Sequence, residues 1–314
     1  ASEATGTVWY NSTSPSALKY SIEGAGAWSA GGTLNNGIRG AGGTGTITAA
    51  LKAGGMPPTG PVAESAVCET YDGTSWTAVG ALVLGRPFPV TFGTTTAAIT
   101  ATGYNNGTNA TYANSETWNG SAWTETADVN SPRAYASCAN QGTTTAGLIF
   151  AGAGPGVSPP LGVTESYNGT SYTEENDMNT ARKIAGGGGT STAAFIAGGS
   201  PPIGVLHEQW NGTSWSEKNN LNTARYTMGS SGTTTSALIF AGTGDPPLYA
   251  LTEQWNGTSW TEVGDLGTAR ERPARGTGAS GTSALCIGGS VPPAYTLTEE
   301  WADPVYTIKT VTVS

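Results

Sequence analysis

The chain has 314 residues, and only 11% of them are Asp, Glu, Lys or Arg, against about 25% in an ordinary globular domain. Long amphipathic helices need many charged residues on their solvent-facing side, and a membrane-spanning helix needs roughly 20 consecutive apolar residues; the sequence supplies neither. A net charge of −9 argues against a nucleic-acid-binding surface, which requires clustered Lys and Arg. We therefore expect a β-rich protein with no nucleic-acid partner and no insertion into a membrane.

The N-terminal segment predicts a short β-meander over residues 1–32. Its strands are expected at 7–11, 17–21 and 27–30, each containing at least one aromatic or β-branched residue. The residues between them are rich in Ser, Pro and Gly, which favour turns.

Further along the chain, one pattern recurs: an aromatic residue, a short turn and a second aromatic residue. The first aromatic residues of successive copies lie 43 to 49 residues apart, which indicates a repeat architecture. The copies are Tyr71–Trp76, Trp118–Trp123, Tyr167–Tyr172, Trp210–Trp215, Trp255–Trp260 and a degenerate copy that begins at Trp301.

Each repeat predicts four short strands, which we name a, b, c and d. In the copy over 180–219 they are expected at 182–188, 193–199, 205–210 and 214–218. Strand a consists of small residues, strand b is apolar at nearly every position, and strands c and d carry the large aromatic residues. Asn211-Gly212 between c and d predicts a two-residue type I′ hairpin turn. Four antiparallel strands in about 45 residues are typical of a β-propeller blade.

The number of blades follows from counting strands. Sets of strands b, c and d occur seven times if the N-terminal meander is the first set, whereas a clear strand a occurs six times. Residues 1–5 or the alternating tail over 305–313 could supply the seventh. We predict an all-β fold: one β-propeller domain over 1–314 with seven four-stranded blades, in which 1–32 completes the closing blade. The alternative is six blades with an N-terminal β-meander.

The repeat resembles the kelch repeat. The resemblance rests on a Gly pair that ends strand b, an aromatic residue in c, a Trp in d and an Arg that opens the next strand a. It covers about residues 6–314 and implies the fold rather than an activity, because kelch propellers include both binding proteins and enzymes. The Gly pairs are Gly54-Gly55, Gly198-Gly199 and Gly288-Gly289.

The opening segment and the repeats rich in Thr, Gly and Asn also resemble tail-fibre and appendage structural proteins of marine tailed bacteriophages. This resemblance implies a non-enzymatic binding or structural module on a virion surface, outside the cell. Its partner would be a host-surface glycan or receptor, or a neighbouring virion protein. The alternatives are a glycan-degrading enzyme on the same scaffold and an intracellular propeller that binds proteins.

Residue types that carry catalysis are scarce. His207, the single histidine, occupies a position of strand c that is Ser or Thr in most other repeats, so we expect a structural role for it. Cys68, Cys138 and Cys286 lack the spacing of a zinc or redox motif and are expected to be buried free thiols. We therefore predict no enzymatic activity, no catalytic residue, no metal and no cofactor.

A Glu and an Arg recur in every repeat. Repetition indicates architecture, with each Arg paired to a carboxylate or to carbonyls of its blade. The alternative is a ring of Arg at one mouth of the channel that holds an anionic glycan or phosphate. Arg272 and Arg275 depart from the repeat and are candidates for a local anion site. The two series are Glu69, Glu116, Glu165, Glu208, Glu253 and Glu299, and Arg39, Arg86, Arg133, Arg182, Arg225 and Arg270.

The loops between strands b and c and the connectors between d and a should emerge on one face, because the strands alternate in direction. Most b–c loops contain Pro-Pro, which fixes the backbone, whereas the loop over 104–112 is rich in amide and hydroxyl groups. Amides beside aromatic rings suit sugar recognition, although these loops could simply be tight soluble turns. The candidate binding residues of this face are Tyr104, Asn105, Asn106, Asn109, Tyr112, Tyr249, Tyr295, Arg272 and Arg275.

Overall fold

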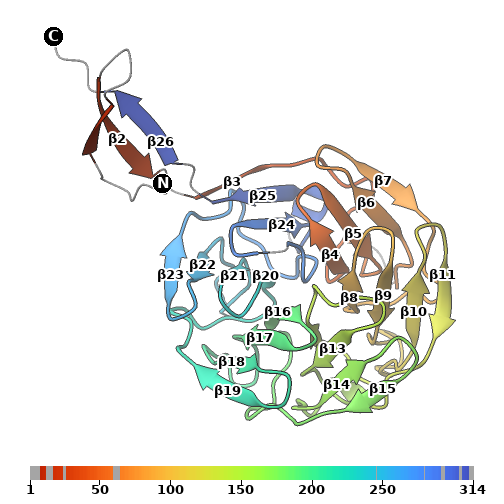
Figure 1. The fold of residues 1–314 in the computed structure, drawn as a ribbon. Helices are drawn as coiled ribbons and strands as arrows, with labels where there is room; N and C mark the ends of the chain where they lie inside the picture. The colour runs from red at the N-terminus through yellow and green to blue at the C-terminus, as the bar shows by residue number, and fades with distance from the viewer. Residues whose placement is uncertain are drawn as a thin grey trace.

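The computed structural model describes residues 8–11, 17–23, 26–58, 64–244, 246–278, 280–290, 294–303 and 306–310. These ranges contain β-strands and two short 3-10 helices, η1 (Pro155–Val157) and η2 (Ala294–Thr296). Among them, no helix has the length and apolar character that crossing a membrane requires. Six antiparallel sheets surround a common axis as the blades of a propeller, and a seventh, three-stranded sheet is separate from them (Figure 1).

Five blades have four strands each, which follow one another in sequence from the axis outward as a, b, c and d. Blade one consists of β4 (Gly42–Thr46), β5 (Ala49–Ala53), β6 (Cys68–Tyr71) and β7 (Trp76–Val79), and blade two of β8 (Val90–Gly93), β9 (Ala98–Ala101), β10 (Ser115–Trp118) and β11 (Trp123–Thr126). Blade three consists of β12 (Ser137–Cys138), β13 (Gly147–Phe150), β14 (Thr164–Tyr167) and β15 (Tyr172–Glu174). Blade four consists of β16 (Gly186–Thr190), β17 (Ala193–Ala197), β18 (His207–Trp210) and β19 (Trp215–Lys218), and blade five of β20 (Gly229–Gly232), β21 (Ala237–Phe240), β22 (Thr252–Trp255) and β23 (Trp260–Val263).

Blade six joins the two ends of the propeller. Its strands b and c are β24 (Ser283–Ile287) and β25 (Thr298–Ala302), and its strand d is β3 (Ala27–Ala30) from the N-terminal segment. Residues 274–278 run along the inner edge of β24: the Ala274 amide donates to the Ile287 carbonyl, and the Leu285 amide donates to the Thr277 carbonyl. The ring is therefore closed by strands from opposite ends of the chain.

The prediction of seven blades is wrong, because the N-terminal strands do not form a blade of their own. β1 (Val8–Asn11) and β2 (Ala17–Glu23) pair instead with β26 (Tyr306–Thr310) in the separate sheet, in the order β1-β2-β26. Of the segment 1–32 that was expected to complete the closing blade, Ala27–Ala30 lies in a blade. The described part of the tail, Tyr306–Thr310, lies in that separate sheet and not at the inner edge of a blade, and residues 1–5, the other expected source of an inner strand, lie outside the described residues. The arrangement matches the six-blade alternative, with β3 assigned to blade six.

The core lies between neighbouring blades, where strand b is buried on both faces. In β21, Leu238, Ile239 and Phe240 are each 0% exposed. Successive residues of a strand point to opposite faces, so strand b contributes to two blade interfaces at once. Phe195 of blade four, for example, belongs to the same apolar cluster as Trp255 and Trp260 of blade five. Full burial of each such side chain stabilises the fold by about 1.5–3 kcal/mol.

Hydrogen bonds between side chains cross most blade interfaces. The indole Nε1 of Trp215 in blade four donates to Thr164 Oγ1 in blade three at 2.9 Å. Trp76 reaches Thr298 of blade six in the same way, and Trp28 of β3 reaches Thr252 of blade five, both at 2.9 Å. The first residue of strand c thus accepts from the strand d ring of the next blade. This arrangement orients the large rings and connects each blade to its neighbour.

The hairpin between strands c and d is longer than the sequence predicted. Trp210 pairs with Trp215, so the loop spans the four residues 211–214, and within it Gly212 alone has a positive φ, of 94°. The Asn211 Oδ1 accepts from the amides of Thr213 and Ser214, both at 2.9 Å. The type I′ prediction is therefore wrong. The Asn side chain caps the turn from its first position instead of adopting a left-handed conformation.

Candidate functional site

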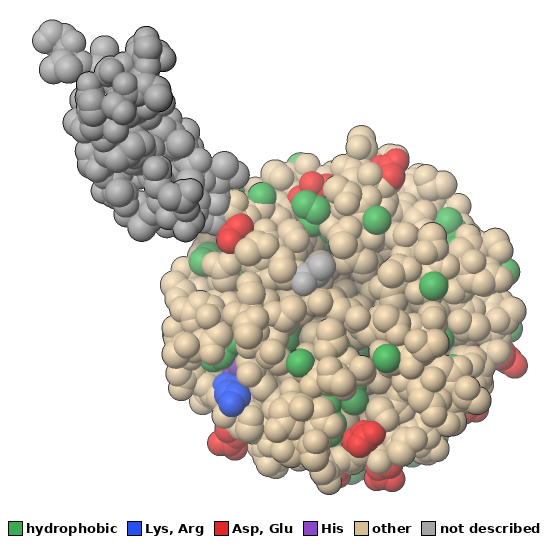
Figure 2. All heavy atoms as spheres, viewed as in Figure 1, with side chains coloured by type: hydrophobic (Ala, Val, Ile, Leu, Met, Phe, Trp, Pro, Cys, Tyr) green, Lys and Arg blue, Asp and Glu red, His purple; other side chains and the backbone are tan. Residues whose placement is uncertain are grey.

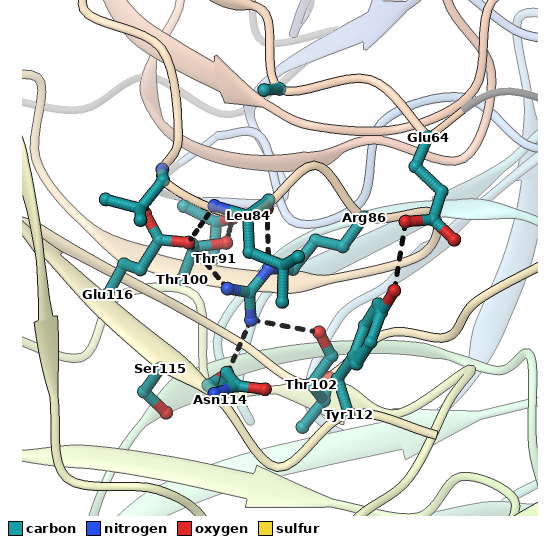
Figure 3. A network of polar contacts seen from close by, with 12 residues as sticks. Glu64, Leu84, Arg86, Thr91, Thr100, Thr102, Tyr112, Asn114, Ser115 and Glu116 are labelled. Atoms are coloured by element: carbon teal, nitrogen blue, oxygen red, sulfur yellow. Dashed lines mark hydrogen bonds and ion pairs between the residues drawn. The ribbon is translucent and has the colours of Figure 1, made fainter. Parts of the chain in front are cut away.

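The recurrent Arg and Glu form buried ion pairs. In blades two to six, the Arg that opens strand a lies 2.5 to 3.0 Å from the Glu of strand c. In blade two, Figure 3 shows the Arg86 guanidinium between Glu116 and the main-chain carbonyls of Thr102 and Asn114. The prediction of pairing with carboxylates and blade carbonyls is thus confirmed for these five arginines, and the alternative of an arginine ring at the mouth is wrong for them.

The same Glu also holds the connector that enters its blade. Glu116 accepts from the amides of Val83 and Leu84 at 2.7 and 3.1 Å, and Glu165 accepts from the amides of Asn130 and Ser131. Burial lowers the pKa of Arg86, and the neighbouring carboxylate of Glu116 counteracts that effect. These carboxylates therefore have a structural role, because the Arg and the connector amides are their hydrogen-bond partners.

In blade one, a lysine replaces the arginine as the cation that pairs with the strand c Glu. Lys52 of β5 lies 3.6 Å from Glu69, and both side chains are fully buried. The residue in the usual arginine position is Ile38, whose carbonyl accepts from Gly289 as the Arg225 carbonyl accepts from Gly199. Arg39 is one residue later and forms no such pair with any residue that the structure describes, so its place in the predicted series is wrong.

The d–a connectors and b–c loops meet on one face, as predicted. Isolated bridges join Ala134 to Ala153 and Lys183 to Ser200, with equivalents in three other blades. One residue further along each connector, the backbone adopts a left-handed conformation around the whole ring. The six residues at this position are Gly40, Phe88, Tyr135, Ile184, Thr227 and Arg272, with φ between 53° and 59°.

Main-chain hydrogen bonds join these left-handed residues from blade to blade. The Phe88 amide donates to Gly40, and the Gly40 amide donates to Arg272, both at 2.8 Å; the series continues through Thr227 and Ile184 to Tyr135. The residues therefore encircle the axis directly above strands a. A left-handed conformation is costly for residues with a side chain, and such strain often accompanies a functional site.

Three aromatic rings meet at this position. The Phe88 ring lies 4.7 Å from that of Tyr135 and 6.0 Å from that of Tyr104, and the two tyrosine rings are 5.3 Å apart. Gly40 allows this arrangement, because a Cβ there would lie 2.5 Å from the Phe88 ring. Phe88 and Tyr104 are buried, while Tyr135 is half-buried.

Cationic side chains surround these rings. Arg272 lies over Phe88, with its Cζ 5.9 Å from the ring centre, and Lys183 Nζ lies 5.9 Å from the centre of the Tyr135 ring. Burial raises the pKa of Tyr135, and Arg272 and Arg275 oppose that shift. We name Phe88, Tyr104, Tyr135, Lys183 and Arg272 the axial mouth. It combines apolar stacking surface with two cations, of which Arg272 lies 3.4 Å from Glu271 and Lys183 donates to the Val157 carbonyl at 2.7 Å.

Positive charge is otherwise scarce in this protein. The chain has only 13 Lys and Arg, and five of the arginines are locked in buried pairs. On the face shown in Figure 2, Asp and Glu are scattered toward the rim, and the one Lys or Arg patch that is visible also lies toward the rim, beside the His side chain. Arg272 and Lys183 of the axial mouth are two of the cations outside those five pairs.

The predicted loop over 104–112 is ordered by its own polar groups. Asn105 Oδ1 accepts from the amides of Gly107 and Thr108, and its Nδ2 donates to the Tyr112 hydroxyl at 3.2 Å. The Tyr112 hydroxyl donates to Glu64, which reaches across from blade one at 2.9 Å (Figure 3). Tyr112 and Asn105 therefore hold the loop in place. Asn106 Nδ2 is buried and has no hydrogen-bond partner within the described ranges, and Asn109 is exposed at the tip.

The remaining predicted residues lie in separate places. Tyr104 and Arg272 belong to the axial mouth, and Arg275 lies beneath it with its Cζ 5.6 Å from the centre of the Phe88 ring. Tyr249 lies in the b–c loop of blade five and donates its amide to Gly242, and Tyr295 lies in η2 of blade six and accepts from Ile38. Sequence reasoning missed Phe88, Tyr135 and Lys183. The signal that could have found them is their distance of one or two residues from the recurrent Arg.

The histidine and the three cysteines, which are the residue types considered for catalysis, are buried. His207 is 1% exposed and its Nδ1 accepts from Trp260 Nε1 at 3.2 Å; burial lowers its pKa to about 4. Burial raises the pKa of the Cys68 thiol to about 11 and that of Cys138 to about 12. All three cysteines are free and buried, as predicted. Across the described ranges, no three His, Cys, Asp or Glu side chains gather closely enough to hold a metal ion.

The opposite end of the channel is filled by blade three. There the chain leaves β12 after two residues, and Asn140 Nδ2 donates to the carbonyls of Gly276 and Gly278 in blade six. Gln141 Nε2 donates to Gly232 in blade five at 2.8 Å. A hollow of about 350 Å³ lies outside this plug, with Thr94 and Thr143 among its lining residues. A second, apolar hollow of about 290 Å³ lies beneath the Pro201-Pro202 loop.

Taken with the sheet order, these features define the chain as a six-bladed β-propeller. No protein-family model matches it, and no curated protein matches it in sequence. Among solved structures, the fold of this chain is similar to that of YjhT, a kelch-repeat protein, with a TM-score of 0.67 and 11% sequence identity. The match covers 90% of this chain and all of the YjhT chain. Similarity at this level of identity concerns the fold.

Proposed function

We propose that this protein is a non-enzymatic binding propeller that holds an anionic glycan or a similar receptor group at the axial mouth. The observation that carries the proposal is the convergence of Phe88, Tyr104 and Tyr135 with the cations Arg272 and Lys183. Aromatic rings stack on the apolar faces of sugars, and Arg binds carboxylate or sulfate groups. The fixed backbone around the mouth reduces the entropy that binding costs.

The absence of enzymatic activity belongs to the same proposal. The six strand c glutamates are occupied by cations and by connector amides, and His207 is enclosed by tryptophan rings. A general acid or base must instead reach a substrate. The side chains offered at the mouth are suited to binding.

The setting that we propose is the surface of a virion, with a host-surface glycan, a receptor or a neighbouring virion protein as the partner. Support for this setting comes from the resemblance of the sequence to phage tail-fibre and appendage proteins. An outward-facing mouth on a fibre would meet host polysaccharide directly.

The test is binding of the full chain to host envelope fractions and to arrays of neutral and acidic glycans. Tyr135→Ala and Arg272→Ala each remove a partly exposed side chain of the mouth, and we expect each to weaken binding about tenfold or more, which is about 1.4 kcal/mol. Tyr249→Ala is the matched control, because it removes an aromatic residue from a b–c loop on the same face but outside the axial mouth, and it should change the Kd less than about threefold.

Two results would contradict the proposal. Equal loss of binding in Tyr249→Ala and Tyr135→Ala would show that the axial mouth is not the site. Release of new reducing ends from the bound polysaccharide would show that the protein is an enzyme.

A further inference from the structure

Arg275 differs from the residues at its position in every other blade. It lies in the inner segment of blade six, where the equivalent residues of the other blades are Gly43, Thr91, Cys138, Gly187 and Ser230. Its main chain bonds to blade one, since its amide donates to the Ala41 carbonyl and its carbonyl accepts from the Gly43 amide. A guanidinium therefore projects into a channel that is otherwise lined by small side chains.

The guanidinium has no carboxylate partner in the described part of the chain. Nη1 donates to the Ala136 carbonyl of blade three at 2.9 Å, and Nη2 has no hydrogen-bond partner. The five arginines of the repeat, by contrast, each lie within 3.0 Å of a Glu oxygen. Arg275 is only 8% exposed. Burial lowers its pKa to about 10, so it remains charged at neutral pH.

A buried charge without a counter-charge is costly. Proteins pair such groups or neutralise them, because removal of an ion from water costs several kcal/mol after relaxation. The nearby charges do not compensate the positive charge of Arg275. Arg272 is a second cation, and its ion-pair partner Glu271 lies on the Arg272 side, 3.4 Å from Nε. The region around Arg275 thus lacks one negative charge.

Arg275 is one of the residues that line a small cavity. Its volume is about 10 Å³, and its walls include Ala136, Ser137, Ser230 and Arg275. The two serine hydroxyls are already committed, because Ser137 donates to Ala185 and Ser230 donates to Gly187. Nη2 is therefore the donor that remains for an occupant. The volume suits a single water-sized body and excludes a sugar ring or a phosphate.

We propose that this cavity binds one monatomic anion, chloride under ordinary conditions, as the counter-ion of Arg275 inside the propeller. The anion accepts from Nη2 and compensates the positive charge that the fold leaves unpaired. This site lies beneath the axial mouth and is independent of the ligand that the mouth binds. A water molecule would fill the same space but would leave the charge uncompensated.

The first test measures thermal unfolding of the full chain in sodium gluconate, whose anion is too large for the cavity, with chloride or bromide substituted at constant ionic strength. Because a ligand that binds only the folded state stabilises it, we expect halide to raise the Tm of the wild type by about 3 °C or more. Arg275→Met should lose this response and should unfold in gluconate at a temperature no lower than the wild type. Lys218→Met, which removes an exposed cation from β19, should keep the full response.

The second test is crystallographic and needs no variant. Crystals of the wild type grown in bromide should show an anomalous scattering peak within about 3.5 Å of Arg275 Nη2, the distance expected for an N–H to halide contact. A peak absent from this cavity would overturn the proposal and assign the space to water. Equal halide responses in Arg275→Met and the wild type would overturn it as well.

Discussion

At the scale of the residue, the recurrence of a buried polar side chain in this propeller is explained by the groups to which it forms hydrogen bonds. The recurrent Glu binds both the Arg of its own blade and two amides of the incoming connector, as Glu253 does with Arg225, Asn222 and Thr223. One carboxylate thereby satisfies three donors that would otherwise be buried unpaired, and leaving one unpaired costs about 1–3 kcal/mol. This explains why the Glu and the Arg recur together.

His207 gives a prediction about pH. Its pKa in the folded protein is about 4, below the ordinary value of 6.5, because burial disfavours the charged ring. As the pH falls, the unfolded chain takes up a proton first. The folded state should therefore lose stability between about pH 6.5 and 4, by up to about 3 kcal/mol from this residue.

The comparison for that prediction is His207→Thr, which introduces the residue found at this position in blades three, five and six. Urea unfolding at pH 7 and pH 4.5 should show a smaller loss of stability for the variant than for the wild type. Parallel losses in the two proteins would mean that His207 is not held neutral by the fold.

At the scale of the element, the c–d hairpins show how local sequence fixes a turn. Asn211 accepts from two amides of its loop, and the same arrangement recurs at Asp72, Asn119, Asn168 and Asn256. All five precede a Thr or Ser by two positions, and the four that are Asn have the spacing of glycosylation sequons, but their side-chain oxygens accept from the amides of the turn. Turn chemistry is sufficient to explain the motif.

Gly212→Ala tests the conformation of this turn. A Cβ at position 212 would meet nothing closer than 3.4 Å, so the cost is conformational and comes from the φ of 94°. We expect the substitution to lower the free energy of unfolding by about 1–2 kcal/mol in urea titrations. Gly107→Ala, at an exposed loop glycine without a positive φ, should change it by less than about 0.5 kcal/mol. A similar cost at both positions would contradict the assigned turn.

At the scale of the whole molecule, the ring depends on β3. Trp28 packs against Trp301 and Phe240, with ring centres 5.6 and 4.9 Å apart, and its Nε1 donates to Thr252 of blade five. Without this strand, the outer edge of β25 would be open. An open edge is a site for unwanted pairing with other chains.

Trp28→Ala should lower the free energy of unfolding by about 2–3 kcal/mol, less than the loss of a fully buried Trp because the side chain is half-buried. Trp28→Phe keeps the packing and loses the indole donor, so we expect about 1 kcal/mol. Denaturant titration measures both, and light scattering reports association through the exposed edge. A stability of Trp28→Ala within 0.5 kcal/mol of the wild type would show that β3 does not secure the ring.

The sequence predicted the blades well because each repeat contains its own pattern of burial and turns. The blade count failed where the pattern depends on residues far apart in the chain. The copy at Trp301 lacks a second aromatic residue, and the structure supplies it as Trp28, which pairs directly with Trp301. The missing second aromatic residue is visible in the sequence, but the prediction places the N-terminal strands in a blade of their own.

The candidate site was predictable only in part, for a related reason. Arg272 and Arg275 were found because they break the repeat. Phe88 and Tyr135 were not found, because they follow the recurrent Arg by two residues in connectors whose sequences vary from blade to blade. The approach of Arg275 to Phe88 and to Ala136 depends on the closure of the ring, which places the inner segment of blade six beside blades two and three.

The six left-handed connector residues have a consequence for how such a protein can change. Their main chains are joined by hydrogen bonds, and the structure keeps the same conformation with Gly, Phe, Tyr, Ile, Thr or Arg at the position. The backbone conformation at these six positions is thus independent of which side chain occupies each of them. New ligand preferences can be acquired by exchanging one side chain at a time, without rebuilding the scaffold beneath.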